Sequence, residues 1–356
     1  MPSPERNAKR QAVLAAFATQ IGWCESLGSP LTAEVLAAVA QDIASGGLAA
    51  PLVADWPGDP LADALALRLA GGLHALALLQ AAPALAACYP PHAAPAAKLR
   101  AAVLEALEVH AGFIKTFLAS PPQTNEVGRS GVLLGGFGRI AQVTGLPLRL
   151  LEIGASAGLN VVWDRYRYRL GGSDWGDPAS AVLIAPAWSG PPPPLNAPLK
   201  VLERAACDIA PVDLEDSAAR LRLSAYVWPD QAARLARLEA AIAIARAAMF
   251  KVERADAADW LAAKLRGLEP GCVTVLFHSI MWSYLPGATQ ARIISLMQSH
   301  GAQATPANPL AWLRFEGHEP KARPELRLTL WPGGREERLA VAHPHGAEVE
   351  WLGQTG

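Results

Sequence analysis

Residues 148–160, which read LRLLEIGASAGLN, combine residue types and a spacing that could bind a nucleotide-like ligand. An apolar run typical of a buried strand ends at Glu152 and Ile153, and Gly154 and Gly158 follow it. Between the two glycines lie three small residues: Ala155, Ser156 and Ala157. Because no side chain in this loop is larger than a hydroxymethyl group, the backbone of a ligand could pass close to it. The segment predicts a strand, a ligand-cradling loop and the start of a helix.

The spacing E-x-G-x-S-x-G resembles the first motif of class I S-adenosylmethionine-dependent methyltransferases and departs from the three-glycine version only at Ser156. Dinucleotide-binding loops need glycines spaced G-x-G and a helix N-terminus aimed at a pyrophosphate. S-adenosylmethionine has no phosphate, so a loop with fewer glycines and an acid beside the amino group of the ligand can bind it. The loop therefore favours S-adenosylmethionine over NAD. The alternative is a tight strand-to-helix turn that binds no ligand.

Composition narrows the classes of partner. The chain has 356 residues and a formal net charge of −1, without a run rich in lysine and arginine, which argues against nucleic acid and anionic membranes as partners. No apolar run approaches the roughly 20 residues of a membrane span. The four cysteines are far apart, so the sequence indicates neither a zinc site nor a disulfide framework. We expect a cytoplasmic enzyme with a small-molecule substrate.

The chain divides into two predicted domains, residues 1–122 and residues 123–356. The first domain is rich in alanine and leucine with helical periodicity, and its apolar N-terminal stretch indicates an amphipathic helix rather than a signal peptide. Its predicted helices cover residues 6–27, 31–45, 60–81 and 95–119. In the second domain strands alternate with helices, which is typical of a largely parallel sheet. Its predicted strands cover residues 148–153, 200–207, 250–254, 272–278 and 310–316.

Three further features complete the predicted second domain. A final meander of strands at 325–331, 337–343 and 347–352 predicts an antiparallel edge on the sheet. The helix expected between the fifth and sixth strands is shortened to about Gly317–Pro324. An insertion at about 165–199, rich in aromatic residues, ends in a proline run that indicates a stiff spacer. We expect this insertion to be looped out between the first and second strands.

Six segments together resemble a bacterial family known only as a domain of unknown function. These are residues 124–130, 150–160, 207–213, 226–231, 278–282 and 342–346. The resemblance covers nearly the whole chain and implies an uncharacterised bacterial protein. Its second half is similar to the Rossmann-like class I methyltransferase fold, preceded by an all-α N-terminal domain.

In the resembled fold the cofactor lies across the carboxyl ends of the first strands. The resemblance implies that Glu152 receives the ammonium group of the methionine moiety, and the alternative is an ion pair with Arg149 or Arg165. Asp208, at the end of the second predicted strand, would accept hydrogen bonds from both ribose hydroxyls. If the insertion contains the second strand, Asp177 takes this role instead. The alternative for Asp208 is that it only caps a helix and contacts no ligand.

Two further cofactor contacts follow from the same resemblance. Asp256 would meet the adenine amino group, or cap the following helix, or do both. Arg129 would bind the cofactor carboxylate from a helix that also carries Asn125 and Glu126, and an ion pair with Glu126 is the alternative. The glycines at 135, 136 and 138 in this helix imitate a dinucleotide fingerprint, but close packing or a kink explains them better.

The catalytic candidates follow the predicted central strand 272–278. His278 could act as a general base, and Ser279 and Trp282 would face the substrate, whereas a buried structural histidine is the alternative reading. The segment His343-Pro344-His345 lacks a partner at metal-ligand spacing, so no metal is predicted.

These features predict a methyltransferase that binds S-adenosylmethionine and methylates a small acceptor. The alternatives are an NAD-dependent oxidoreductase, which the loop spacing disfavours, and a non-catalytic ligand-binding or scaffold protein with the same fold. No pattern in the sequence specifies the acceptor, the presence of activity or the oligomeric state.

Overall fold

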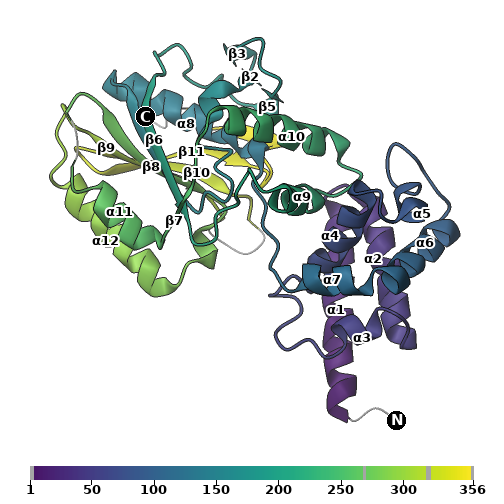
Figure 1. Ribbon diagram of the computed structural model, residues 1–356. Coiled ribbons are helices and arrows are strands. Elements are labelled where there is room, and N and C mark those ends of the chain that lie inside the picture. The colour runs from purple at the N-terminus through teal and green to yellow at the C-terminus, as the bar shows by residue number, and fades with distance from the viewer. Residues whose placement is uncertain (1–3, 268–269, 318–321, 354–356) are drawn as a thin grey trace. The chain divides into compact units, whose positions relative to one another are not determined.

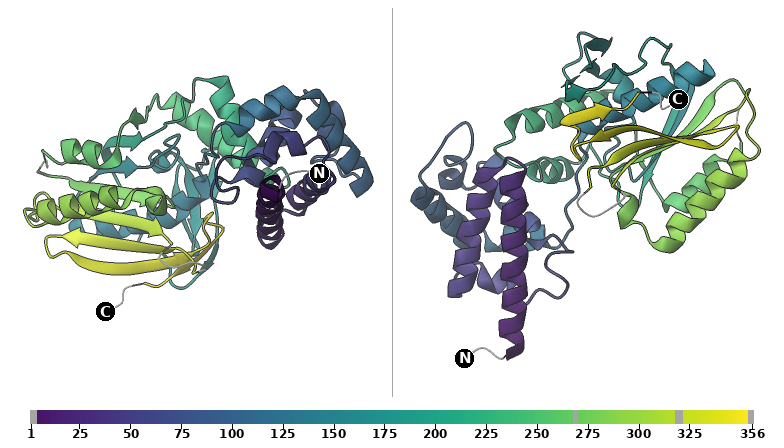
Figure 2. Two further views of the ribbon diagram at one scale, coloured as in Figure 1. Left: turned by 90° about the horizontal axis from the view of Figure 1, so that it is seen from below. Right: turned by 180° about the vertical axis from the view of Figure 1, so that it is seen from behind.

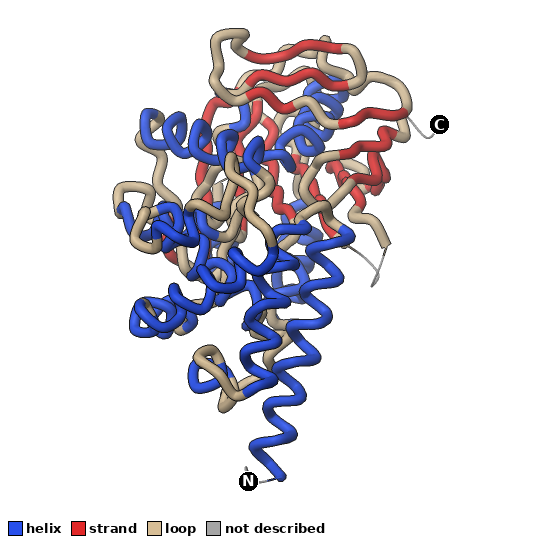
Figure 3. The backbone as a smooth tube through the Cα atoms, turned by 90° about the vertical axis from the view of Figure 1, so that its right-hand side faces the viewer, coloured by secondary structure: helices blue, strands red, loops and turns tan. Residues whose placement is uncertain are grey.

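The computed structural model describes residues 4–267, 270–317 and 322–353. The internal contacts of the chain define two compact units. Unit 1 comprises Met1–Thr124 and Asp216–Glu239, and unit 2 comprises Asn125–Glu215 and Ala240–Gly356. All described strands belong to unit 2, as the red segments of Figure 3 show. None of the helices in the described ranges has both the length and the apolar character that a bilayer crossing requires.

Unit 1 is a helical domain, as predicted, around a core that includes Phe17, Leu36 and Leu69, all fully buried. The predicted helix at 95–119 is two helices that meet at His110. Helices α1 and α2 pack side by side (Figure 2). The helices of this unit are α1 (Pro4–Ser26), α2 (Pro30–Ser45), α3 (Ala50–Val53), α4 (Leu65–Leu78), α5 (Pro83–Ala86), α6 (Ala96–Val109), α7 (Ala111–Leu118), α9 (Ser217–Ala225) and the first half of α10 (Ala232–Ala247).

The segment 216–239 was predicted to lie in the second domain, whereas the structure groups it with unit 1. The reason is the apolar face of α9. Ala225 and Tyr226 form a buried cluster with Ala75 and Phe117, and the Tyr226 ring lies 5.6 Å from the ring of Phe117. Packing between residues distant in sequence therefore decides the membership of this segment.

Unit 2 contains a nine-stranded sheet of order β5-β12-β11-β10-β9-β8-β1-β6-β7. Strands β7, β6, β1, β8 and β9 are parallel. Strands β10 to β12 form the predicted antiparallel meander, which pairs with β9 and is drawn in yellow tones in Figure 2. The predicted mixed α/β fold with a mainly parallel sheet is confirmed. The strands are β1 (Leu148–Ile153), β5 (Ala187–Ser189), β6 (Val201–Asp208), β7 (Glu253–Arg254), β8 (Val273–Ser279), β9 (Leu310–Glu316), β10 (Glu325–Trp331), β11 (Arg335–Ala342) and β12 (Glu348–Trp351).

Helices cover both faces of this sheet (Figure 1). Helix α8 (Ser130–Thr144) lies on one face, and α11 (Ala257–Lys264) and α12 (Gly287–Gly301) lie on the other. Adjacent residues of β9 show the alternation. Trp312 packs in a cluster with the α12 residue Met297, whereas a Cβ on Gly136 of α8 would lie 2.5 Å from Leu313. Close packing thus explains this glycine, as expected.

The insertion is only partly looped out. It forms a small sheet from β2 (Arg167–Leu170), β3 (Ser173–Gly176) and β4 (Leu183–Ile184), but β5 adds to the edge of the large sheet beside β12. The shortened helix predicted at about Gly317–Pro324 includes residues 318–321, which lie outside the described residues. Strands β9 and β10 leave only residues 317–324 for this connection.

Candidate functional site

The carboxyl end of β1 is the point at which the chain order of the sheet switches direction. Strand β1 lies between β6 and β8, and the chain fills the β6 side before it crosses to β8. In open α/β sheets such a switch point leaves a crevice beyond the strand ends in which ligands bind. Glu152, the loop at 154–158 and Asp208 all lie at this edge.

The loop after β1 has the backbone conformation of a glycine-rich turn at three positions. The φ angles are +63° at Gly154, +54° at Ser156 and +73° at Gly158. Ser156, the one departure from the three-glycine motif, thus adopts a conformation that L residues rarely take. Its backbone N–H donates to Asp208 Oδ2 at 2.8 Å. The candidate ribose acid therefore holds the loop in its strained shape.

The side chain of Met281 packs directly over Gly154. A Cβ at this position would lie 2.5 Å from Cε of Met281, a residue that follows β8. Met281 was missed in the sequence because no motif marks it. A ligand that passes over Gly154 must displace this side chain, and an unbranched methionine can change rotamer at little cost.

Glu152, at the carboxyl end of β1, is buried, with a relative exposure of 2 %. Burial raises the pKa of its carboxyl well above the ordinary value, the Asp208 charge raises it further, and Arg129 opposes them. Its Oε2 atom has no hydrogen-bond partner among the described residues. The alternative ion pair with Arg149 is not formed there, because Arg149 Nε contacts Glu203 Oε2 at 2.9 Å.

Two more polar atoms of the same segment are buried without a partner within the described part of the chain: Ser156 Oγ and Asn160 Oδ1. The amide nitrogen of Asn160 donates to the Glu126 carbonyl at 3.3 Å, so its side chain is fixed while its oxygen is left over. Buried polar atoms in native proteins are rarely unsatisfied. Three such atoms within residues 152–160 fit a site that a polar ligand or water completes.

Asp208, and not Asp177, ends β6, which pairs with β1 in the large sheet. Its two oxygens accept from Ser156 N and, at 2.8 Å, from Ala210 N. A carboxylate has about four lone-pair positions, so two stay available for a diol. Asp177 lies beyond β3 of the small sheet and accepts from Ala179 N instead. Ile209, which sequence reasoning missed, is 70 % exposed beside Asp208.

Asp256 caps α11, accepting from the backbone N–H groups of Ala258 and Asp259 at 2.9 and 3.1 Å. The prediction that Asp256 caps the following helix is therefore confirmed. The neighbouring Ala255 N donates to the Asp208 carbonyl at 3.1 Å, so the turn that carries Asp256 lies directly beside the end of β6. A cap with its side chain in this position still has lone pairs for a ligand donor.

The predicted helix that carries Asn125, Glu126 and Arg129 is wrong, because only a 3-10 turn, η1 (Val127–Arg129), precedes α8. Asn125 instead accepts from Leu159 N at 2.8 Å and fastens the end of the loop. Arg129 donates to the carbonyls of Pro344 and Ser279 at 3.0 and 3.1 Å. In this position Arg129 joins the end of β8 to the last hairpin, and its charge lies close enough to Glu152 to lower the pKa of that carboxyl.

His278 is fully buried, and both of its ring nitrogens are engaged. Nδ1 lies 2.7 Å from Glu316 Oε1, and Nε2 lies 3.2 Å from the indole Nε1 of Trp312, which can only donate. These partners place the proton on Nδ1 and occupy the Nε2 lone pair. The ring also stacks on Trp282 of η3 (Trp282–Tyr284), at 5.1 Å between centroids. This geometry favours the structural reading of His278 over the general base.

Glu316 is a second residue that sequence reasoning missed. Besides His278 it accepts from Met281 N, at 3.1 Å to Oε1 and 3.2 Å to Oε2. Met281 follows Ile280, whose φ of +49° is rare for a β-branched residue. Glu316 thus positions the segment whose methionine covers Gly154. An acid at the end of a predicted strand was the available signal, the same one that marked Glu152 and Asp208.

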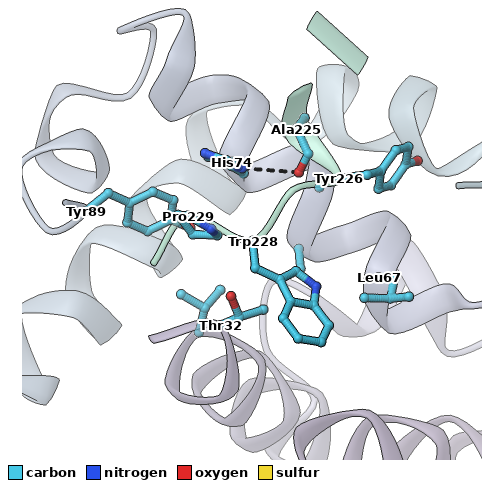
Figure 4. Close-up of a pocket in the computed structure, with 11 residues that line it drawn as sticks. Thr32, Leu67, His74, Tyr89, Ala225, Tyr226, Trp228 and Pro229 are labelled. Atoms are coloured by element: carbon cyan, nitrogen blue, oxygen red, sulfur yellow. Dashed lines mark hydrogen bonds between the residues drawn. The ribbon is translucent and has the colours of Figure 1, made fainter. Parts of the chain in front are cut away.

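The helical unit contains a second buried histidine, His74 (Figure 4). Its Nδ1 lies 3.1 Å from the Ala225 carbonyl, and its ring lies 5.8 Å from that of Tyr89. Burial lowers the pKa of His74 to about 4. Of the two cavities that His74 lines, the one shared with Tyr226 has a volume of about 10 Å³ and the one shared with Leu78 has about 400 Å³. A neutral ring with its Nδ1 engaged by a backbone carbonyl offers no charge to a ligand in either cavity. His74 is therefore a neutral packing residue.

No group of three or more His, Cys, Asp and Glu side chains in the described ranges is arranged to hold a metal ion. His343 and His345 contact each other, with ring centroids 5.1 Å apart, and His343 Nδ1 accepts from His345 N. The four cysteines are buried thiols.

Over residues 14–351 the chain matches the family described as "Uncharacterized protein conserved in bacteria (DUF2332)", and it belongs to that family. The predicted membership in an uncharacterised bacterial family is thereby confirmed. No curated protein and no solved structure gives a significant match.

Proposed function

We propose that this member of the DUF2332 family binds S-adenosylmethionine at the carboxyl end of β1 and transfers its methyl group to a small acceptor. The proposed fold of unit 2 is the Rossmann-like sheet of class I methyltransferases. The observation that carries the proposal is the buried Glu152 carboxyl. It lies at the switch point of the sheet with an unsatisfied oxygen, beside a strained loop that Asp208 holds.

The residues present fit this ligand in kind. An ammonium group donates hydrogen bonds and carries positive charge, so it would satisfy Glu152 Oε2 and favour the ionised carboxylate. Ser156 Oγ and Asn160 Oδ1 offer further polar contacts, and Asp208 retains lone pairs for two hydroxyl donors. Asp256 lies on the adjacent turn, where it can meet a further donor.

Bound there, S-adenosylmethionine would supply a methyl group on a sulfonium centre. The chain would contribute mainly alignment of the acceptor with that methyl group, because positioning provides most of the catalysis in a displacement of this kind. A general base is required only for an acceptor that must lose a proton. Since both nitrogens of His278 are engaged, the proposal assigns it to positioning of Glu316 and leaves Ser279 and Trp282 as candidate substrate contacts.

Isothermal titration of the full chain with S-adenosylmethionine, S-adenosylhomocysteine and NAD tests the proposal. We expect both adenosyl ligands to bind with a stoichiometry of one and NAD to give no heat of binding. Binding of NAD alone would support an oxidoreductase instead. Binding of the adenosyl ligands without methyl transfer to any acceptor would support a non-catalytic ligand-binding protein.

A further inference from the structure

A groove of about 440 Å³ runs along the face of the sheet that carries α12, away from the loop after β1. Its floor is formed by β9 and β10, and one wall is the exposed side of α12 at Ile294 and Gln298. Helix α12 lies beside the antiparallel strands in Figure 2, and no described helix follows it in the chain. The volume is within the range of about 300–1,000 Å³ that is common for small-molecule sites.

Three indole rings line the groove: Trp282, Trp312 and Trp331. The rings of Trp282 and Trp312 meet edge to face, with centroids 5.6 Å apart. Large flat π-surfaces around one cavity favour a planar aromatic ligand, because stacked and edge-to-face rings gain energy beyond that of area burial. The lining therefore points to an aromatic ring as the apolar part of the ligand.

Arg314 supplies the polar part of the groove. Its guanidinium lies over the Trp312 ring at 4.3 Å, and Nη2 contacts Thr329 Oγ1 at 2.8 Å and Glu336 Oε2 at 2.5 Å. The Nε atom is buried and has no acceptor among the residues that the structure describes. A guanidinium has only donors, so the missing partner must be a hydrogen-bond acceptor.

The donor geometry of Arg314, and not the balance of charges around it, selects the acceptor. Arg314 lies opposite Arg327 on β10, which in turn lies opposite Arg338 on β11. The carboxylates that pair with these three arginines are Glu336 and Glu325. Glu316, which also lines the groove, is the third carboxylate on this face, so three positive charges face three negative charges. The planar N–H donors of Arg314 match the oxygens of a carboxylate, and this geometry favours an anionic acceptor. At the far end of the groove both oxygens of Glu316 already accept hydrogen bonds.

We infer that this groove binds a small planar aromatic carboxylate, with its ring among Trp282, Trp312 and Trp331 and its carboxylate on Arg314 Nε. The groove shares Trp282 with the candidate substrate contacts of the proposed function, but binding of an aromatic carboxylate in it does not depend on that function. The groove adjoins the cofactor loop through Glu316, which holds Met281 over Gly154.

Titration calorimetry of the full chain with naphthoate as the probe tests the inference. We expect one site, with affinity at least tenfold weaker in Trp331→Leu and in Arg314→Lys, which keeps the charge but lacks the planar Nε–H. Trp23→Leu, which removes an exposed tryptophan of the helical unit, is the matched control and should leave binding unchanged. Thermal melts of each variant confirm that it is folded.

Two related probes test the chemistry of the ligand. Cyclohexanecarboxylate has the charge without the aromatic ring, and naphthylmethylamine has the ring with the opposite charge. We expect both to bind at least tenfold more weakly than naphthoate. Equal or tighter binding of the amine would overturn the inference in favour of an aromatic cage for cations, and naphthoate binding that neither groove variant weakens would place the ligand elsewhere. Absence of naphthoate binding at millimolar concentration would also overturn it.

Discussion

The loop after β1 and the groove beside α12 differ in what each lacks. At the loop, three polar atoms are buried without partners, yet the side chain of Met281 fills the space over Gly154. At the groove, about 440 Å³ is open and most polar groups are paired, with Arg314 Nε as the exception. The loop therefore offers polar contacts to a ligand but little open space, whereas the groove offers open space but few unsatisfied polar atoms.

This difference shows that a motif and a cavity report separate properties. A glycine motif reports where the backbone must turn or be approached closely. It does so even where a side chain, such as that of Met281, occupies the adjacent space in the structure. A cavity reports open volume, which here is created by side chains of β8 to β11, η3 and α12 together. The predictions below test whether the two regions are independent sites, and they run from the largest expected effect to the smallest.

The largest effect is expected from Gly154→Val. A left-handed φ costs a side-chain residue about 1–2 kcal/mol, and the valine side chain would stand over the loop in the space that the ligand backbone crosses. We expect affinity for S-adenosylmethionine to fall by about 100-fold or more, measured by titration calorimetry. Binding of naphthoate in the groove should be unchanged.

Gly145→Val is the matched control for this variant. Gly145 has nearly the same φ, +65°, but nothing within 4 Å of a Cβ, so it carries the backbone cost without the clash. It should lower the melting temperature less and leave S-adenosylmethionine affinity intact. Equal loss of affinity in both glycine variants would mean that general destabilisation, and not the loop, is responsible.

Asp208→Ala should weaken S-adenosylmethionine binding by about 1.5–3 kcal/mol, because the ribose hydroxyls lose a charged acceptor and Ser156 N loses the bond that holds the loop. Asp213→Ala removes a similar turn bond, from Glu215 N, at an exposed position of the same segment and serves as the control. Titration calorimetry of both variants decides the matter. Unchanged affinity in Asp208→Ala would contradict the ribose assignment.

The central strands of unit 2 could be predicted from the sequence because β1, β8 and β9 are mainly apolar segments of six or seven residues. Strand β1 has the predicted bounds, and β8 differs by one residue at each end. The switch point follows from the same runs, so Glu152 and Asp208 could be placed at strand ends before any coordinates. Strand β7 is only two residues long, and its prediction was correspondingly too long.

Contacts between residues distant in sequence explain what could not be predicted. Segment 216–239 joins unit 1 because Tyr226 packs on Phe117, and β5 joins the large sheet because it pairs with β12. The groove depends on cross-strand neighbours such as Trp312 and Thr329, whose register no single-sequence pattern specifies. The partners of His278 are likewise 34 and 38 residues away.

His278→Asn tests the structural reading of this histidine. Glu316 and the Trp312 indole would lose their partner, which should lower the free energy of unfolding by about 1–3 kcal/mol, measured by denaturant titration. Affinity for S-adenosylmethionine should change little. His92→Asn, at an exposed position of the helical unit, is the control. A stable variant whose turnover falls by roughly 10²–10⁴-fold would instead establish His278 as a general base.

The smallest effect is expected from Glu152→Gln in the ligand-free protein. Burial raises the pKa of Glu152 in the folded state above its unfolded value of about 4.3. At pH values between the unfolded pKa and the folded pKa, the folded state therefore binds more protons than the unfolded state. The wild-type protein therefore loses stability as pH rises through this window, and the glutamine variant does not. We expect the melting temperature of the variant to exceed that of the wild type by a margin that grows with pH.

The same substitution tests the contact with the ligand. An ammonium ligand favours the ionised carboxylate, so the wild type should release protons when it binds S-adenosylmethionine, and calorimetry detects this release as a buffer-dependent heat. The variant should bind more weakly and without this release. A variant that is no more stable, yet binds equally well, would show that Glu152 is neither strained nor a ligand contact, and the groove would then be the better-supported binding site of the two.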